Sequence, residues 1–311
     1  MDRQQLDDVK PSSLSQMIGQ VSVIQQCKVA LDACQMDNRR FEHSALVGPP
    51  GLGKSQLASV IAQELASDFI EVLGQSIRQP ADLNTLLLAA EEKTIVHIDE
   101  AHELPKAMQT AIYLALDKRC LVLGGNHTVS LNDFTLLMST TDEYGLLQPL
   151  RDRCRLVLRY EFYSIEDLRE ILRQRIRALG WIVDPTVLSA IAERARGTPR
   201  IALRLLQSCW RYCRSEGREA IASNDLFRAC ELEQLQGALG LGPVEQRYLQ
   251  IISLGSTRLN VISSMLGLPT RTVSQVIEPF LIRSSLITKD DYGKRLLTPQ
   301  GRTYLTAQNA V

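Results

Sequence analysis

A glycine-rich loop carries the clearest chemical signal in the sequence. It follows the apolar run Ser44–Val47, precedes an amphipathic stretch from Gln56 to Leu65, and reads Gly48-Pro49-Pro50-Gly51-Leu52-Gly53-Lys54-Ser55. Glycines let backbone N–H groups surround phosphates at the start of a helix, the lysine reaches the β and γ phosphates, and the hydroxyl after it ligates Mg²⁺. The pattern therefore predicts a site for ATP and Mg²⁺, with a tight strand-to-helix turn as the alternative.

Two adjacent carboxylates follow a second apolar run. Asp99 and Glu100 come directly after Thr94–Ile98, a run typical of a buried strand. Both are therefore expected at the carboxyl end of a parallel strand, where ligands of α/β sheets bind. Asp99 is predicted to hold Mg²⁺, and Glu100 to orient and polarise the water that attacks ATP. Solvated turn residues are the alternative, and a structural hydrogen bond is expected for His102.

The order of the segments indicates the fold that positions this loop. Residues 1–162 alternate apolar runs with helical stretches, which predicts an α/β domain with a parallel sheet flanked by helices. Residues 163–236 are expected to be all-helical, with Ser164 as a cap and Thr198-Pro199 as the start of another helix. Residues 237–311 follow a glycine-rich join and have the spacing of a winged helix-turn-helix. The predicted strands of the sheet are Ser44–Val47, Phe69–Val72, Thr94–Ile98, Phe134–Ser139 and Leu156–Tyr160.

Composition limits the remaining choices. Lys plus Arg and Asp plus Glu both number 35, so any DNA contact must come from local clusters of charge. The seven cysteines include no C-x-x-C pair; Cys209 and Cys213 are expected to be buried, with metal ligation as the alternative. Met1–Asp8 has no signal-peptide core and no apolar run is long enough to cross a bilayer. No membrane contact is predicted, and the expected location is the cytoplasm.

These motifs resemble those of a known family. Val47–Lys54 and Ile98–Leu104 look like the nucleotide motifs of RuvB, the AAA+ ATPase that drives branch migration of Holliday junctions in bacteria. The resemblance extends over nearly the whole chain and implies a P-loop AAA+ core, a helical lid and a C-terminal winged helix. It further implies ATP and Mg²⁺ as cofactors, four-way junction or duplex DNA as partner, and a homo-oligomeric ring, expected to be a hexamer. The implied activity is an ATP-dependent DNA motor of helicase type in recombination and repair.

The resemblance assigns further residues to the nucleotide. Lys10–Gln20 is similar to the family's adenine-pocket segment, which would bring Ile18 to the base. Phe134–Thr141 is similar to its first sensor strand, so Thr141 would read the γ-phosphate. A pair of turn hydroxyls at Thr140 and Thr141 is the alternative.

Two arginines are assigned in the same way. Pro149–Cys154 resembles the segment with the family's arginine finger, and Arg153 would act on the ATP of a neighbouring subunit. A guanidinium supplied in trans accelerates phosphoryl transfer by roughly 10³- to 10⁵-fold. Arg151 would assist it or form an interface salt bridge. Gly197–Ile201 is similar to the second sensor, so Arg200 would bond the γ-phosphate of its own subunit.

Three segments depart from the family pattern. The wing usually carries a proline-arginine-glycine-arginine tip, but here Asp290 and Asp291 lie between the expected backbone contacts Lys289, Lys294 and Arg295. A hairpin predicted over residues 121–131, with a Gly-Gly-Asn turn, looks shorter than the one that docks RuvA in the family. Residues 142 and 143, after the first sensor, are acidic where the family normally has arginine, which predicts an acidic patch near the pore-facing side.

Two other functions stay open at this point. A RuvB relative could remodel a protein or nucleoprotein partner, or load a clamp, without RuvA. A nucleotide-dependent switch could bind DNA without moving along it. Glu100 and Arg153 favour turnover over a passive switch, whereas the altered wing and hairpin leave the junction substrate and the RuvA-like partner undecided.

Overall fold

The computed structural model describes residues 9–123, 127–255 and 257–308, which form two compact units. The first unit extends to Ile171 and also includes Thr198–Arg200. The second comprises Leu172–Gly197 and the chain from Ile201 onward. The division therefore falls inside helix α6 (Ile165–Leu179).

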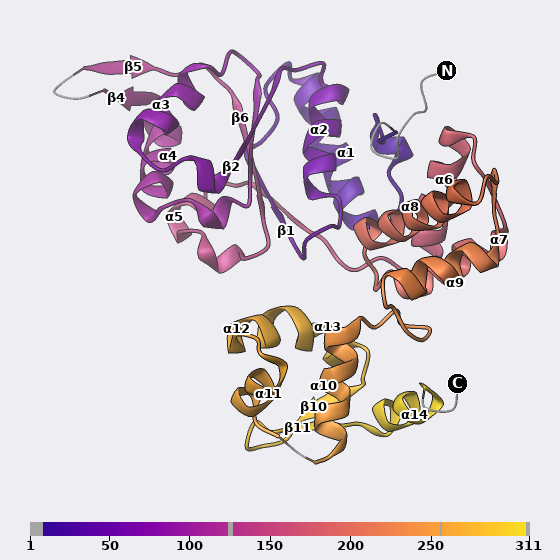
Figure 1. Ribbon diagram of the computed structural model, residues 1–311. Coiled ribbons are helices and arrows are strands. Elements are labelled where there is room, and N and C mark those ends of the chain that lie inside the picture. The colour runs from indigo at the N-terminus through magenta and orange to yellow at the C-terminus, as the bar shows by residue number, and fades with distance from the viewer. Residues whose placement is uncertain (1–8, 124–126, 256, 309–311) are drawn as a thin grey trace. The chain divides into compact units, whose positions relative to one another are not determined.

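A five-stranded parallel sheet lies at the centre of the first unit, in the order β2-β3-β6-β1-β7 (Figure 1). Strand β6 lies between β1 and β3, and Val47 at the end of β1 is in register with Thr140 at the end of β6. The carboxyl ends that carry the glycine-rich loop, the acidic pair and the sensor threonines therefore meet at one edge. The predicted strands are all present within one residue of their expected ends: β1 (Ser44–Val47), β2 (Phe69–Leu73), β3 (Ile95–Asp99), β6 (Thr135–Thr140) and β7 (Leu156–Arg159).

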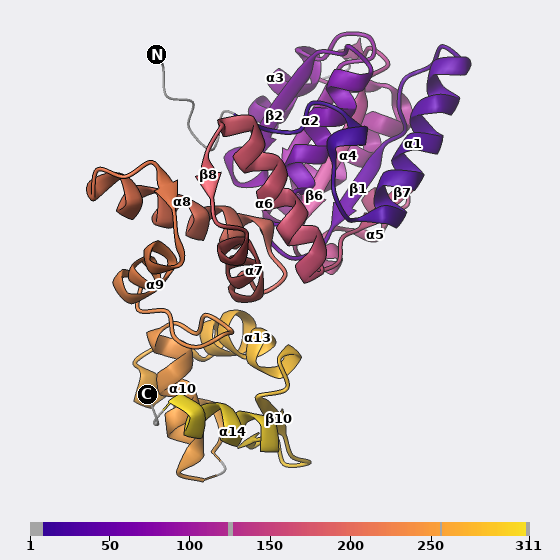
Figure 2. The ribbon, with the colours of Figure 1, turned by 90° about the vertical axis from the view of Figure 1, so that its right-hand side faces the viewer.

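Helices cover both faces of this sheet (Figures 1 and 2). Neighbouring residues of β6 point to opposite faces: Leu137 joins the core under α1 and α2, while Leu136 and Met138 join the core under α3 and α4. Both cores consist mainly of apolar residues, as expected for a sheet buried on two sides, with His97 and Ser139 among the buried polar residues. The helices of this unit are α1 (Val21–Met36), α2 (Lys54–Glu64), α3 (Pro80–Leu88), α4 (Lys106–Lys118) and α5 (Gln148–Arg151), with short 3₁₀ turns at Leu14–Gln16, Gly74–Ser76, Ala101–Glu103 and Glu143–Gly145.

The predicted hairpin is present as two antiparallel strands, β4 (Cys120–Val122) and β5 (Thr128–Ser130). Its Gly-Gly-Asn turn, residues 124–126, lies outside the described residues. Val122, Leu123 and Val129 are exposed apolar side chains on this element. The hairpin thus presents an apolar surface, while Leu121 of β4 joins the core of the domain.

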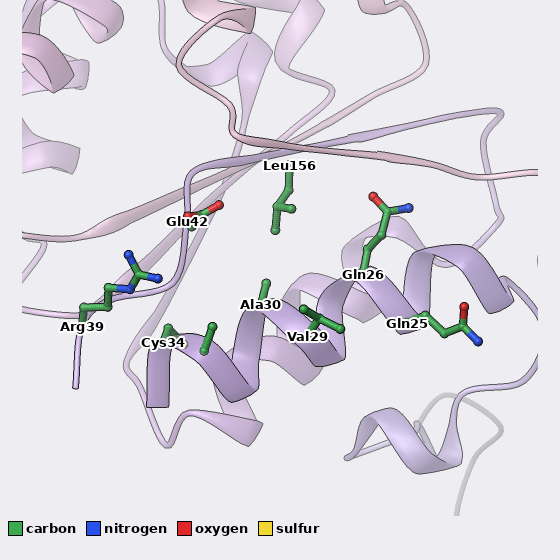
Figure 3. A pocket seen from close by; sticks show the side chains of 9 residues that line it. Gln25, Gln26, Val29, Ala30, Cys34, Arg39, Glu42 and Leu156 are labelled. Carbon is green, nitrogen blue, oxygen red and sulfur yellow. The ribbon is translucent and has the colours of Figure 1, made fainter. Parts of the chain in front are cut away.

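A hollow of about 420 Å³ lies beside α1, at the β7 edge of the sheet (Figure 3). Val29 and Ala30 of α1 face Leu156 of β7 across it, and Arg39 and Glu42 lie at one end. Its lining includes none of the glycine-rich loop or the acidic pair. The hollow is therefore separate from the predicted nucleotide site.

The lid part of the second unit contains the end of α6, α7 (Pro185–Arg194), α8 (Pro199–Ser215) and α9 (Ser223–Leu232). The Ser164 cap is confirmed, because its hydroxyl accepts the N–H of Asp167 at 3.0 Å. A short parallel pair, β8 (Ile182–Val183) with β9 (Ala220–Ile221), is present in a region expected to be helical only. These strands have two residues each, too few to give a period-2 pattern in the sequence.

Two tryptophans stack in this lid. The rings of Trp181 and Trp210 lie nearly parallel, at 13°, with centroids 4.3 Å apart. The guanidinium of Arg214 lies 5.5 Å from the ring centroid of Trp210. The stack links the chain after α6 to the middle of α8.

The winged helix has its own apolar core around Tyr248, Leu249 and Leu281. The helical stretch over residues 270–283 is interrupted by a π-helical turn, because Pro279 has no N–H to donate and its ring crowds the carbonyl four residues earlier. A last helix was missed, although Thr298-Pro299 repeats the cap-and-proline signal of Thr198-Pro199. The elements are α10 (Pro243–Ser253), α11 (Leu259–Leu266), α12 (Thr270–Thr272), the π turn (Val273–Ile277), α13 (Glu278–Arg283), β10 (Ile287–Lys289), β11 (Arg295–Leu297) and α14 (Pro299–Gln308).

Cys209 and Cys213 are fully buried on α8, which confirms that they are core residues. Burial raises the pKa of the Cys209 thiol, so it stays protonated and a poor metal ligand. Within the described ranges, no cluster of three or more His, Cys, Asp or Glu side chains has the arrangement of a metal site. Among the residues that the structure describes, no helix is long and apolar enough to span a bilayer.

Candidate active site

The predicted phosphate loop lies between β1 and α2, as the motif requires. Gly48 and Gly51 both have positive φ, at 152° and 78°. A Cβ at Gly48 would lie 2.8 Å from the Cβ of Tyr160, and one at Gly51 would lie 3.0 Å from the Cβ of Arg200. Larger residues are excluded by these contacts and by the backbone, so the loop keeps the tight form whose N–H groups can approach a phosphate. Leu52 anchors the loop in the core.

Lys54 begins α2, and its side chain folds over the loop. Its Nζ donates to the carbonyl oxygens of Gly48 at 2.7 Å and Pro49 at 2.9 Å, and the residue is only 6% exposed. Burial lowers the pKa of the Lys54 ammonium, while the carboxylates of Glu100 and Asp99 raise it. A bound phosphate would add negative charge and stabilise the ammonium further. The lysine thus has the place and surroundings that the predicted phosphate contact needs.

Ser55 and Asp99 form the candidate magnesium site. Ser55 Oγ donates to Asp99 Oδ2 at 3.2 Å, which brings the two predicted ligand oxygens together from α2 and β3. The other carboxylate oxygen of Asp99 accepts the N–H of Glu100 at 3.0 Å, which fixes the orientation of the carboxylate. Mg²⁺ usually takes one or two protein oxygens together with phosphate oxygens and water, so this donor set fits the ion.

Glu100 is held by an unusual backbone conformation. Its φ of 49° and ψ of 50° are left-handed, which costs a non-glycine residue roughly 1–2 kcal/mol. Gly74 permits the turn, since a Cβ there would lie 2.5 Å from the carbonyl oxygen of Glu100. Thr141 Oγ1 donates to Glu100 Oε2 at 3.1 Å. The predicted water-activating carboxylate and the predicted first sensor are therefore in direct contact.

His102 lies behind this pair. Its Nδ1 is 3.1 Å from Thr140 Oγ1 and 3.3 Å from Glu100 Oε2. Its Nε2 is 3.4 Å from Glu103 Oε1. These contacts agree with the expected structural hydrogen bond, because the ring links the end of β6 to the turn that follows β3.

Arg200 belongs to the first unit even though it opens a lid helix. Its backbone N–H donates to the carbonyl of Gly51 at 3.4 Å, and its side chain is exposed. The positive charge of Arg200 lowers the pKa of Lys54, so its guanidinium is close enough to repel the Lys54 ammonium. This position beside the phosphate loop is the one a cis-acting sensor would need.

The predicted adenine segment, Lys10–Gln20, is tied to the chain after β7. Gln20 Nε2 donates to the carbonyl of Glu161 at 2.6 Å, and Gln20 Oε1 accepts the N–H of Glu161 at 3.1 Å. Ile18 is half-buried within this segment. The two bonds fix the segment to the chain that follows β7.

Tyr163 is a candidate site residue that the sequence analysis missed. Its hydroxyl donates to the carbonyl of Leu52 in the phosphate loop at 3.1 Å. A Cβ at Gly19 would lie 2.8 Å from its ring, so the ring packs on the adenine segment. Burial raises the pKa of Tyr163 to about 12, which keeps the hydroxyl a donor. The available signal was an aromatic residue directly before the Ser164 helix cap.

Arg153 lies with α4 and α5, in the layer across the sheet from α2 (Figure 1). Its Nε donates to Asp117 Oδ1 at 2.9 Å, and its Nη1 donates to the carbonyl of Pro149 at 2.9 Å. These contacts hold it away from the loop of its own chain. The arrangement agrees with a residue that acts on another subunit. Arg151 lies 5.1 Å over the ring of Tyr144.

Of the two acidic residues after the first sensor, Glu143 is neutralised within the subunit and Asp142 is exposed. Glu143 is paired through both carboxylate oxygens with Arg159 at the end of β7, and its side chain is only 15% exposed. Asp142 caps a 3₁₀ turn by accepting the N–H of Gly145 at 3.1 Å. The pairing of Glu143 with an arginine 16 residues later is one that no local pattern indicates. The acidic patch on the pore-facing side stays a prediction.

Three protein-family models match the chain, in the same order as its predicted domains. The model of the P-loop domain of the Holliday junction DNA helicase RuvB matches residues 9–160. The RuvB AAA lid domain matches residues 163–236, and the RuvB C-terminal winged helix domain matches residues 238–306. The chain belongs to the RuvB family.

Individual RuvB proteins are similar over nearly their full length. The Holliday junction branch migration complex subunit RuvB of Wolbachia sp. subsp. Brugia malayi is 33% identical over 311 residues, covering 97% of this chain and 94% of the relative. The RuvB subunit of Kosmotoga olearia is 32% identical over 297 residues, covering 92% and 86%. The solved Thermotoga maritima RuvB Holliday junction branch migration motor has a TM-score of 0.83 at 30% identity, covering 96% and 98%. These matches confirm the predicted P-loop core, helical lid and winged helix.

In the wing of this RuvB family member, the predicted DNA contact at Arg295 is wrong. Arg295 is buried, with Nε bound to Glu278 Oε1 at 2.7 Å, Nη2 bound to Glu278 Oε2 at 3.1 Å and Nη1 bound to the carbonyl of Gly293 at 2.7 Å. Lys289 Nζ lies 3.1 Å from the same carboxylate, and the hydroxyl of Tyr248 donates to it at 2.9 Å. Arg295 was expected to contact a phosphate, but a carboxylate from α13, distant in sequence, holds it inside the domain.

Of the other two predicted contacts, Lys289 is exposed and Lys294 is half-exposed. Lys289 shares the charge of Glu278, so a phosphate would have to compete with that carboxylate. Of the three predicted wing cations, Lys294 is the one that is not paired with Glu278.

Proposed function

We propose that this chain is an ATP-hydrolysing motor subunit that, like RuvB, acts on Holliday junction DNA during branch migration in recombination and repair. One observation carries the proposal: α2, the end of β3 and the end of β6 converge at one edge of the sheet and bring together Lys54, Ser55, Asp99, Glu100 and Thr141. A P-loop that only bound nucleotide would have no need of a carboxylate held at Glu100 by a strained backbone.

Each residue then has a distinct task. The N–H groups of Gly48–Ser55 and the ammonium of Lys54 bind the phosphates, and Arg200 contacts the γ-phosphate from the lid side. Ser55 and Asp99 would hold Mg²⁺, which when bound neutralises phosphate charge. Glu100 Oε2 accepts a hydrogen bond from the attacking water and orients it. Thr141, already bonded to that oxygen, links the position of the carboxylate to the γ-phosphate.

Assembly and partners belong to the same proposal. The three matched parts act as an ATPase core at 1–162, a lid at 163–236 and a winged helix at 237–311. Subunits form a homo-oligomeric ring, a hexamer, in which Arg153 reaches the ATP of the neighbour. The apolar hairpin β4–β5 is the candidate dock for a RuvA-like partner, because Val122, Leu123 and Val129 are exposed there. The cytoplasm is the proposed location.

ATP hydrolysis by the full-length protein tests the proposal, measured alone, with duplex DNA, with a four-way junction, and with a junction plus RuvA. Turnover is expected in the wild type and is expected to rise with the junction. Lys54→Ala should abolish nucleotide binding, whereas Glu100→Gln should bind ATP but lose about 10²- to 10⁴-fold in turnover. Glu103→Gln is the matched control, since this neighbouring carboxylate contacts only the edge of His102. Normal turnover in Glu100→Gln would remove it from the water-activating role.

A second candidate is remodelling of a protein or nucleoprotein partner without RuvA. The observation in its favour is that Arg295 and Lys289 at the wing are bound to Glu278, which reduces the charge available for DNA. Turnover that ignores every form of DNA, and DNA binding that is absent in the assembled ring, would favour this candidate over the junction motor.

A further inference from the structure

The guanidinium of Arg153 is fixed by four contacts within its own subunit. Nε and Nη2 donate to the two oxygens of Asp117, and Nη1 donates to the carbonyl of Pro149 at 2.9 Å. Its Cζ lies 5.5 Å from the ring centroid of Tyr113. Asp117 and Tyr113 are one turn apart on α4, so a single helix face supplies both the carboxylate and the ring.

The pattern of donors leaves part of this group available. A guanidinium has five N–H groups in a rigid plane, of which these contacts use three. One N–H remains on each terminal nitrogen, a number and spacing that suit two oxygens of a phosphate. The side chain is 32% exposed, so the remaining donors lie within reach of solvent or of a neighbouring molecule.

The pairing differs from the ordinary surface ion pairs of the same unit. Arg39 with Asp37 and Arg155 with Glu42 are single contacts, at 3.1 Å and 3.7 Å. Such pairs contribute little and restrict the arginine weakly. Arg153 instead has both carboxylate oxygens, a carbonyl and a ring, which together set its position and its plane. The hydrogen bond from Arg153 also lowers the pKa of Asp117, which therefore stays ionised at neutral pH.

We propose that Asp117 is a positioning residue for Arg153, holding its guanidinium in place with two N–H groups directed to the phosphates of a neighbouring subunit. This inference rests on the proposed trans action of Arg153. Asp117 touches no reacting atom. Asp117 restricts the rotamers of Arg153 before the reaction, so the arginine loses less conformational entropy when the transition state forms.

Steady-state ATP hydrolysis tests this with Asp117→Ala in the full-length protein. kcat is expected to fall about 10- to 30-fold, the loss that matches the rotamer freedom of one long side chain. KM and the Kd of a fluorescent ATP analogue should be unchanged, because the substitution lies outside the phosphate loop of the same subunit. Asp117→Asn, which keeps one acceptor oxygen, should lose less.

Asp133→Ala is the matched control. Asp133 is exposed to a similar degree, at 43% against 41%, and pairs with Arg40 at 2.8 Å in the same unit. Its loss should leave kcat within about 2-fold. An equal fall in Asp133→Ala and Asp117→Ala would mean that any lost salt bridge in this unit lowers turnover, and would overturn the proposal.

Mixed rings show which subunit carries the defect. Asp117→Ala subunits diluted into excess Lys54→Ala subunits face intact Arg153 groups, so their turnover per site should return to that of wild-type subunits diluted in the same way. Wild-type subunits diluted into the Lys54→Ala, Asp117→Ala double variant should show the 10- to 30-fold loss. A defect that stays with the ATP-binding subunit, or an unchanged kcat in undiluted Asp117→Ala, would overturn the positioning role.

Arg153→Ala separates the two levels of the argument. If Arg153→Ala hydrolyses ATP normally, the trans-acting arginine of the proposed function is wrong and the positioning role falls with it. If Arg153→Ala is inactive while Asp117→Ala keeps its kcat, the proposed function stands and only the role of Asp117 is overturned.

Discussion

Arg153 and Arg295 are held by the same arrangement in two different regions. Each guanidinium donates to both oxygens of one carboxylate and to a nearby backbone carbonyl. The side chain of Arg153 is 32% exposed, whereas that of Arg295 is 10% exposed and its partner Glu278 is fully buried. An exposed pair can serve a ligand, but a buried pair cannot be opened without leaving a charge in the core. Exposure of the pair, rather than an arginine at a family position, separates the two roles.

The largest expected effect lies on the exposed side of this comparison. Arg153→Ala should lower kcat by about 10³- to 10⁵-fold and leave ATP affinity intact, because in the proposed role the guanidinium contributes only to the transition state of the neighbour. The thermal midpoint should change little, since an exposed pair contributes little to folding. Arg39→Ala removes an ordinary exposed pair and serves as the control for turnover. A large fall in the midpoint for Arg153→Ala would place it with Arg295 and end the distinction.

Loss of the buried pair of Arg295 and Glu278 should instead lower the free energy of unfolding. Arg295→Ala is expected to cost the winged helix about 3–5 kcal/mol in urea unfolding, because it leaves Glu278 buried without its main partner. Lys289, 3.1 Å from the same carboxylate, should hold the loss near the lower end of that range. Replacing both partners, Glu278→Leu with Arg295→Met, should recover most of the stability. Unchanged unfolding together with weaker DNA binding would mean that Arg295 contacts DNA after all.

The half-buried imidazole of His43 gives the next smaller effect. His43 accepts the N–H of Leu136 at 2.9 Å, and burial lowers its pKa to about 3. Between pH 6.5 and 3 the unfolded chain therefore binds a proton that the folded chain does not, so stability falls as pH falls, by at most about 1.4 kcal/mol per pH unit. Unfolding measured at pH 7, 6 and 5 should show a shallower slope in His43→Asn than in the wild type. Exposed His127→Asn is the control, and the same slope in both would reject this account.

The smallest effect concerns the wing cation that the comparison leaves for DNA. Lys294→Ala should reduce the slope of log affinity against log salt by about 1 in full-length protein bound to duplex DNA. Exposed Asp291→Asn should change affinity in the opposite direction, because it removes a charge that repels phosphate. A slope that ignores Lys294 would leave the wing without a role in DNA binding.

The nucleotide edge could be predicted from the sequence because each of its signals is local. Lys54 and Ser55 lie in one loop, and Asp99 and Glu100 end one strand, so the parallel sheet needs only to bring two strand ends together. Tyr163 was missed because its partners, Gly19 and Leu52, are far away in sequence and it belongs to no motif.

The wing and the first sensor show where such reasoning fails. Whether Arg295 faces solvent depends on Glu278, and whether Glu143 forms an acidic patch depends on Arg159. No regular sequence spacing predicts either ion pair, so the sequence alone does not show that these charges are neutralised. The helix at Pro299 differs from these pairings, because Thr298-Pro299 is a local signal of a helix start.

The stacked rings of Trp181 and Trp210 make the lid optically distinctive. They are the only two tryptophans in the sequence, and their near-parallel overlap at 4.3 Å couples their ultraviolet transitions. Near-ultraviolet circular dichroism should therefore carry a paired band from this one place. Any nucleotide-driven shift of the chain after α6 against α8 would change the sign pattern or intensity of that band, so the lid carries its own spectroscopic probe without a label.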